Sequence, residues 1–279
     1  MAVVVVTDSS SRLGSDDLKQ WNVRQVPLHV LVDSDDMRDG VDDVPYDIHD
    51  RARASTSGAS PAELADTYRQ ALADSDGDGV LAVHISAALS STFSSAVSAA
   101  REFGPSVRVV NSRSAAMGVG FVALAAAKSA ASGADLNTVE AAARSATDRG
   151  HVFVVVHRLD NLRRSGRIGT AASWLGTALS LKPLLCLDVD GRLVLDQRIR
   201  TITKAHAAMV DRVVELVGDN RAAIAVHHVD NHDAADEVGA ALTTRLPQIE
   251  SLTVTDMGPV LSIHVGGGSV GVVVQIAEG

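Results

Sequence analysis

The sequence contains very few of the residues that define several protein classes. Its 279 residues include one cysteine, which excludes an intrachain disulfide and a zinc site built from cysteines. Cys186 lies in an apolar stretch, and a small buried residue is its simplest role. Aromatic residues make up 3% of the chain although 46% is hydrophobic. Any internal cavity must therefore be lined mainly by aliphatic side chains.

Long apolar runs and an excess of positive charge are also missing. No apolar run approaches the ~20 residues of a membrane span. The first ten residues, MAVVVVTDSS, lack the basic segment that opens a signal peptide, so we expect a cytoplasmic protein. The formal net charge of -9 argues against nucleic acid as a general partner.

The pattern of apolar and polar segments predicts two α/β domains. Strand-like and helix-like segments alternate through the first half, which favours a mostly parallel sheet. Later, a turn at Asp190–Gly191 between two apolar runs predicts a hairpin and hence a mixed sheet. We expect an N-terminal domain over 1–157, whose segment 55–75 is a candidate to pack with the second domain, and a C-terminal domain over 158–279.

Several elements of the second half can be predicted with defined bounds. An apolar helix is expected over 171–181. Three closely spaced strands are expected to end the chain, over 249–255, 259–264 and 270–276.

The most informative stretch is 79–100. Val80–Ile85 is a short apolar run that predicts a buried strand. A helix is expected from Ser94, and hydroxyl residues crowd the turn between: Ser86, Ser90, Ser91, Thr92, Ser94 and Ser95. Free backbone N–H groups and the helix dipole make such a turn suitable for an anion. The alternative is that Ser90 or Ser91 only caps the helix.

Two further apolar runs lead into similar polar loops. The strand predicted over 2–6 runs into Thr7-Asp8-Ser9, and that over 107–110 runs into Asn111-Ser112. If the three strands are parallel neighbours, their loops share the carboxyl edge of one sheet, where open α/β sheets bind ligands. The repetition therefore favours a binding site over three unrelated caps.

Several motifs suggest other chemistry and are set aside. The run from Gly266 to Gly271 matches G-x-G-x-x-G, but a strand is expected to follow it instead of the helix that dinucleotide binding requires. His227, His228 and His232 lack the spacing of a zinc site, and the acidic segment 33–50 lacks that of a calcium loop. No metal is expected. A serine hydrolase remains a minority hypothesis, because serines are too common in this chain to nominate one as the nucleophile.

The segment 158–204 reverses the charge of the chain. It holds nine lysines and arginines against four aspartates. A mixed solvated surface would explain this charge, and so would a docking face for an acidic partner or a phosphate.

Six motifs in order resemble the DegV family, bacterial fatty-acid-binding proteins, over nearly the whole chain. They are VVVVTDSSSRL, STSGASP, ISAALSSTFSSA, VRVVNSRSAAMGVG, the block LRRSGRIGTAASWLGTALSLKPLLCLDVDGRL with RIRTITKA, and MGPVLSIHVGGGSVGVVV. The resemblance implies two α/β domains with a long-chain fatty acid buried between them. It also implies that the acid is presented to a separate ATP-dependent fatty acid kinase subunit, which forms acyl phosphate.

The family's ligand-binding residues fall on Thr56, Ser90 and His264, with Ser91 beside them. Its partner-docking arginines fall on Arg167 and Arg200. The resemblance thus implies a lipid-binding carrier subunit, not an enzyme, that needs no cofactor; transient membrane contact would be compatible with this role. Two departures, Gly58-Ala59 and Ala87-Ala88 with Ser91, alter the loops around the ligand. The alternatives are an acyl hydrolase using Ser90 and His264, or a lipid-responsive regulatory protein.

Overall fold

The computed structural model describes residues 2–168 and 181–278, and its chain divides into two compact units. The first unit comprises residues 1–44 and 56–150, and the second comprises residues 45–55 and 151–279. The chain therefore contributes a short early segment to the second unit before it completes the first. Throughout the described ranges, each helix is too short or too polar to cross a membrane.

The first unit is built on four parallel strands in the order β2-β1-β6-β7. Their bounds are β1 Val4–Asp8, β2 Val23–Val26, β6 Val80–His84 and β7 Val107–Asn111. All five residues of β6 are buried, as its continuous apolar run predicted. The five residues of β1 are buried too, but this strand extends beyond the run predicted over 2–6 and includes Thr7 and Asp8. The predicted parallel N-terminal sheet is confirmed.

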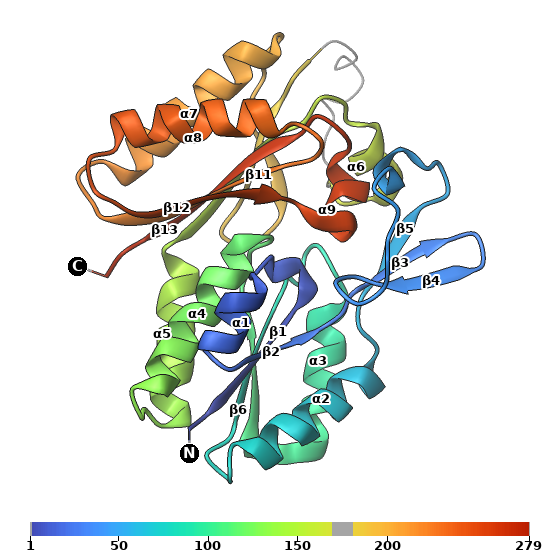
Figure 1. The fold of residues 1–279 in the computed structure, drawn as a ribbon, viewed down its shortest axis with the longest axis vertical. Helices are drawn as coiled ribbons and strands as arrows, with labels where there is room; N and C mark the ends of the chain where they lie inside the picture. Colours follow the sequence, from blue (N-terminus) through green and yellow to red (C-terminus); the bar gives the residue numbers. More distant parts are fainter. Residues whose placement is uncertain (1, 169–180, 279) are drawn as a thin grey trace. The chain divides into compact units, whose positions relative to one another are not determined.

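Helices cover both faces of this sheet (Figure 1). One side is packed by α2 (Pro61–Asp74) and α3 (Thr92–Ala100), and the other by α4 (Met117–Ala131) and α5 (Leu136–Asp148). The start of α2 is fixed by a capping box. The Ser60 hydroxyl accepts from the N–H of Glu63, whose carboxylate accepts from the N–H of Ser60.

The apolar segment 23–32 forms two strands that are divided at Pro27. Its first part is β2, an edge strand, and its second part is β3 (His29–Val32) in a separate sheet of order β4-β3-β5. That small sheet also contains β4 (Asp35–Arg38) and β5 (Ser55–Ser57). Short helix α1 (Ser15–Gln20) precedes β2.

The second unit is built on a six-stranded mixed sheet of order β10-β9-β8-β13-β11-β12. Within it, β11 runs parallel to β12 and antiparallel to β13, and β9 is antiparallel to both β8 and β10. The bounds are β8 Gly150–Val155, β9 Leu184–Leu187, β10 Leu193–Gln197, β11 Ala222–His228, β12 Ile249–Asp256 and β13 Val270–Ile276. The predicted mixed C-terminal sheet is confirmed, including the hairpin at Gly191.

Helices α7 (Ile202–Val217) and α8 (His232–Arg245) lie beside one another on this sheet (Figure 1). Apart from Met209 and Phe153, the buried core between these helices and the strands consists of aliphatic side chains. Two shorter helices, α6 (Asp160–Ser165) and α9 (Gly258–Val265), pack against each other, and α9 also packs on the single turn Ile48–Asp50.

One strand prediction is wrong. Residues 259–264 form most of helix α9 and not a strand between β12 and β13. Pro259 at the first turn suits a helix start, and Val260 and Ile263, three residues apart, are both buried on one face. The β-branched residues made this segment strand-like, but in the packed unit β13 pairs directly with β11. The helix predicted over 171–181 falls outside the described residues, apart from its last residue.

Candidate functional site

The carboxyl edge of the first sheet gathers the three polar loops. The Ser86 N–H donates to the Ser114 carbonyl at 2.9 Å, and the Ser112 N–H donates to the His84 carbonyl at 3.1 Å. The Asn111 side-chain oxygen accepts from the N–H of Ala87 at 3.1 Å. The prediction that these loops share one edge is confirmed.

A fully buried polar chain lies beneath this edge. The Asp8 carboxylate accepts from the N–H and hydroxyl of Ser10, from the N–H of Ile85 at 3.0 Å and from His84 Nδ1 at 3.0 Å. On the other side of the ring, His84 Nε2 lies 2.9 Å from the Tyr68 hydroxyl. Burial, and then the Asp8 charge, raise the pKa of Tyr68 far above its usual range, so its hydroxyl keeps its proton for His84.

Sequence patterns alone do not predict this chain. Asp8 belongs to the first of the three polar loops, but nothing near it in the sequence indicates that its partner is a histidine at the end of β6, or that this histidine contacts a tyrosine from α2. The arrangement joins β1, β6 and α2 and holds the start of the hydroxyl-rich turn in place.

Most hydroxyl groups at the edge are occupied by backbone contacts. Ser9 Oγ accepts from the N–H of Leu28 at 3.0 Å, and Ser112 Oγ donates to the His84 carbonyl at 2.7 Å. Ser90 is only half-buried, and its Oγ lies 2.9 Å from Thr92 Oγ1 and accepts from the Thr92 N–H. Ser9 and Ser112 therefore stabilise the loops of the edge, whereas the Ser90 hydroxyl stays within reach of solvent.

Ser91 occupies the cap position of α3, is exposed, and makes no capping bond with its side chain. The helix start instead uses Ser90 Oγ. Of the two serines in the capping alternative, Ser90 therefore makes a capping bond at this helix start and Ser91 does not.

The structure brings the strand of Thr56 to the same turn. Thr56 is half-buried in β5, two residues before Gly58. A Cβ atom at Gly58 would lie 2.6 Å from Thr92 Oγ1, closer than such contacts allow, and a tight 3.3 Å from Ser91 Oγ. Glycine at this position thus lets β5 approach the Ser90–Thr92 turn, and two of the predicted ligand-binding residues lie on neighbouring segments of the first unit.

His264 belongs to the second unit, in the last turn of α9. Burial, and then the nearby Arg167 charge, lower the pKa of His264 to about 4. The imidazole is therefore neutral near pH 7 and can serve as an N–H hydrogen-bond donor without carrying a charge.

The two arginines predicted to dock a partner differ in their surroundings. Arg167 follows α6, is half-buried, and donates from Nη1 to the Ser165 carbonyl at 2.5 Å. Arg200 lies exposed just before α7. Arg167 thus combines a surface position with an electrostatic effect on His264.

The glycine-rich run after α9 leads into strand β13. A dinucleotide site would need a helix there, so this agrees with the expectation from the sequence. Gly268 has a φ of +80°, and a Cβ there would lie 2.7 Å from the His157 ring. The glycines therefore permit close packing. Among residues 2–168 and 181–278, no group of three or more His, Cys, Asp or Glu side chains could hold a metal ion.

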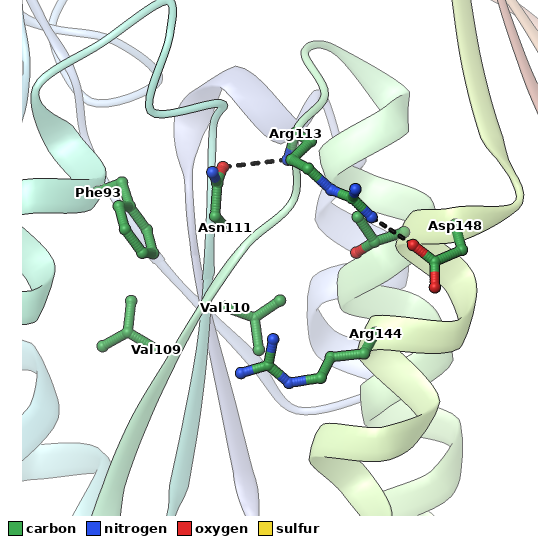
Figure 2. Close-up of a pocket in the computed structure, with 8 residues that line it drawn as sticks. Phe93, Val109, Val110, Asn111, Arg113, Arg144 and Asp148 are labelled. Atoms are coloured by element: carbon green, nitrogen blue, oxygen red, sulfur yellow. Dashed lines mark hydrogen bonds and ion pairs between the residues drawn. The ribbon is translucent and has the colours of Figure 1, made fainter. Parts of the chain in front are cut away.

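A separate open groove of about 380 Å³ lies at the edge strand of the first unit (Figure 2). Phe93, Val109 and Val110 give it an apolar part. Its guanidinium groups are already paired, Arg113 with Asp148 and Arg144 with Glu140. This mixed lining suits an aliphatic chain poorly.

Comparisons with known proteins agree on one family. The model of a family described as uncharacterised DegV proteins matches residues 2–277. A DegV domain-containing protein of Mycobacterium tuberculosis is 62% identical over 276 residues, covering 99% of this chain and 98% of that protein. Another from Streptomyces coelicolor is 36% identical over 98% of both chains.

Solved structures give the same result. A structure described as fatty acid binding of a DegV family protein from Thermus thermophilus has a TM-score of 0.93, with 33% identity and coverage of 99% of this chain and 100% of that one. DegV of Bacillus subtilis, described as a fatty acid binding protein, has a TM-score of 0.88 and 25% identity, with the same coverage.

Proposed function

Because this chain belongs to the DegV family, we propose that it binds a long-chain fatty acid non-covalently, with Thr56, Ser90 and His264 holding the carboxylate. The observation that supports the proposal most is the close packing of β5 against the Ser90–Thr92 turn, which places two hydroxyl side chains on adjacent segments. A neutral His264 adds an N–H donor.

The acyl chain supplies most of the affinity in this proposal. Each buried methylene contributes about 0.8 kcal/mol, so ten or more exceed any single polar contact. The aliphatic composition of the chain, with few aromatic residues, suits such a tail. The polar residues would then select for a carboxylate and fix its register.

The ligand test starts from protein purified from a bacterial host. Denaturing extraction and mass spectrometry should find about one acid per chain, as a single pocket predicts. Absence of lipid together with no binding of long-chain acids by the purified protein would refute the proposal. Turnover of a chromogenic ester by the protein alone would instead favour the hydrolase.

The assignment of residues that bind the carboxylate is tested with two variants and one control variant. Ser90→Ala and His264→Ala should each weaken acid binding by about 5- to 150-fold, the equivalent of losing a hydrogen bond worth ~1–3 kcal/mol. Ser94→Ala is the matched control, because the exposed Ser94 hydroxyl lies in the first turn of α3, just after Ser90, and donates to the Ser91 carbonyl. Wild-type affinity in both test variants would show that the assignment is wrong.

We further propose that the protein presents its acid to an ATP-dependent fatty acid kinase subunit, with Arg167 and Arg200 in the docking face. Arg163, Arg164 and Arg200 are all exposed, so their charges are accessible to a partner. The protein itself then acts as a carrier without catalytic residues or cofactor, and the kinase forms the acyl phosphate.

Reconstitution with the cognate kinase subunit tests docking. Arg167→Ala should lower acyl-phosphate formation about tenfold for each 1.4 kcal/mol lost, and the loss should diminish as salt rises. Arg158→Ala is the control, because Arg158 is 79% exposed and pairs only weakly with Asp160. As a check that the substitution leaves the ligand in place, fatty acid binding by wild type and Arg167→Ala should be compared above pH 7, where His264 is neutral in both proteins. Normal phosphorylation of Arg167→Ala at limiting carrier would exclude the docking role.

A further inference from the structure

A single asparagine holds the end of helix α9. Asn161 Nδ2 donates to the Ile263 carbonyl at 3.0 Å and to the His49 carbonyl at 3.2 Å. The Ile263 carbonyl is one of the last four of the helix, which lack partners within the helix. Ile263 directly precedes His264, so this bond acts at the residue that presents the imidazole.

The surroundings leave the amide little freedom. Gly266, with a φ of +81°, passes so close that a Cβ there would lie 3.2 Å from Asn161 Nδ2. The second acceptor belongs to a turn that is itself anchored, since Ile48 is 1% exposed and His49 Nε2 lies 3.2 Å from the Asp230 carboxylate. Asn161 therefore ties α9 to a fixed support.

Asn161 also sits at the start of the helix that leads to Arg167. Helix α6 ends at Ser165, Gly166 takes a left-handed conformation, and Arg167 follows. The arginine acts on His264 through its charge. One short helix thus contacts α9 through Asn161 at its beginning and influences His264 through the residue just beyond its end.

We propose that Asn161 is a positioning residue for the carboxylate site, because its amide fixes the last turn of α9 and thereby the orientation of His264. This inference rests on the proposed binding of a fatty acid. It differs from a general stabilising role, which any helix-end cap would have.

The chain provides a matched control for that general role. Asn220 Nδ2 donates to the Val217 carbonyl at 2.9 Å and so closes the end of α7 in the same way. Asn161→Leu and Asn220→Leu each remove one capping amide. Both should lower the unfolding temperature, but only Asn161→Leu should weaken binding of palmitic acid, by about tenfold for a lost contact of ordinary strength.

A double-mutant cycle separates positioning from stability. When His264 is already alanine, Asn161→Leu should cause no further loss of palmitic acid affinity, because the imidazole that it positions is gone. Losses that multiply in the double variant, or equal losses in Asn161→Leu and Asn220→Leu, would overturn the inference. If Asn161→Leu does not fold, Asn161→Ser supplies one donor for the two carbonyls and should give a smaller loss of the same pattern.

A readout without lipid keeps this test apart from the proposed function. The His264 imidazole signal can be assigned in NMR spectra by its loss in His264→Ala. Its titration midpoint should move in Asn161→Leu and stay unchanged in Asn220→Leu. If the wild type binds no acid while the midpoint moves, the proposed function fails and the positioning role stands. An unmoved midpoint overturns the positioning role.

Discussion

Within the buried Asp8–His84–Tyr68 chain, the contribution of the Tyr68 hydroxyl to stability can be tested by a single substitution. Replacing Tyr68 with phenylalanine keeps the ring but leaves His84 Nε2 facing the interior without its 2.9 Å partner. The free energy of unfolding should fall by ~1–3 kcal/mol, the usual cost of an unsatisfied buried group. Denaturant unfolding measures it.

Tyr46→Phe is the control for that substitution, because Tyr46 is 79% exposed and water can replace the hydrogen bond between its hydroxyl and Asp230. It should change the unfolding free energy by less than ~0.5 kcal/mol, as exposed substitutions usually do. Equal effects of the two substitutions would show that the Tyr68–His84 bond contributes nothing to stability.

His264 gives the protein a predictable sensitivity to acid. Its folded pKa of about 4 lies below the ordinary value of 6.5, so between these pH values the unfolded chain binds a proton that the folded chain does not. Stability linked to this group is therefore complete above the unfolded pKa and is lost as pH falls toward the folded one. Unfolding free energies of wild type and His264→Gln, measured at pH 7.5 and pH 5, should show the larger loss in wild type. A larger loss in His264→Gln would contradict the depressed pKa.

At the scale of elements, the contact of β5 with the start of α3 depends on Gly58. In Gly58→Ala the new methyl would meet Thr92 Oγ1 at 2.6 Å and the Thr92 nitrogen at 3.1 Å, so β5 must move away. We expect a loss of ~1–3 kcal/mol in unfolding free energy, typical of overpacking, and weaker acid binding because Thr56 moves with the strand.

Gly14→Ala serves as the comparison, since a Cβ at Gly14 meets nothing within 4 Å and its φ of -68° suits any residue. It should leave acid binding unchanged. Calorimetric titration of both variants measures the difference, and unaltered affinity in Gly58→Ala would separate β5 from the ligand.

For the whole molecule, the proposal that Ser90 and His264 bind the same carboxylate predicts that bound acid slows hydrogen exchange near both residues. Amides of the Ser86–Thr92 turn and of the 258–268 segment should both exchange more slowly when the acid is bound, because binding to the folded state raises the cost of opening it. Exchange measured by mass spectrometry with and without acid tests this. Protection confined to one unit would contradict a shared site.

The domain boundary expected between residues 157 and 158 stays a prediction. In the structure, segment 45–55 groups with the second unit although it precedes most of the first in sequence. Buried Ile48 and the His49–Asp230 contact account for that grouping. No feature of the segment 45–55 itself identifies Asp230 as its partner.

The sequence by itself determined most elements and both sheet types. Apolar runs, turn residues and helix caps act between near neighbours, so β1, β6, β11, α2 and the Gly191 hairpin follow from local patterns. The hydroxyl-rich turn after β6 was identified for the same reason. Where local preference and packing disagreed, as at residues 259–264, the local pattern predicted a strand and the packed unit contains a helix.

Only the tertiary structure decided how the candidate site is held together. Three contacts hold it: the Asp8–His84–Tyr68 chain, the approach of Gly58 to Thr92, and the hydrogen bond from Asn161 to α9. Tyr68 and His84 are 16 positions apart on separate elements, and the other pairs are separated by 34 to 102 positions. Such contacts depend on which faces of folded elements meet. That choice is made by the packing of the whole unit, because each element's own sequence is compatible with many partners.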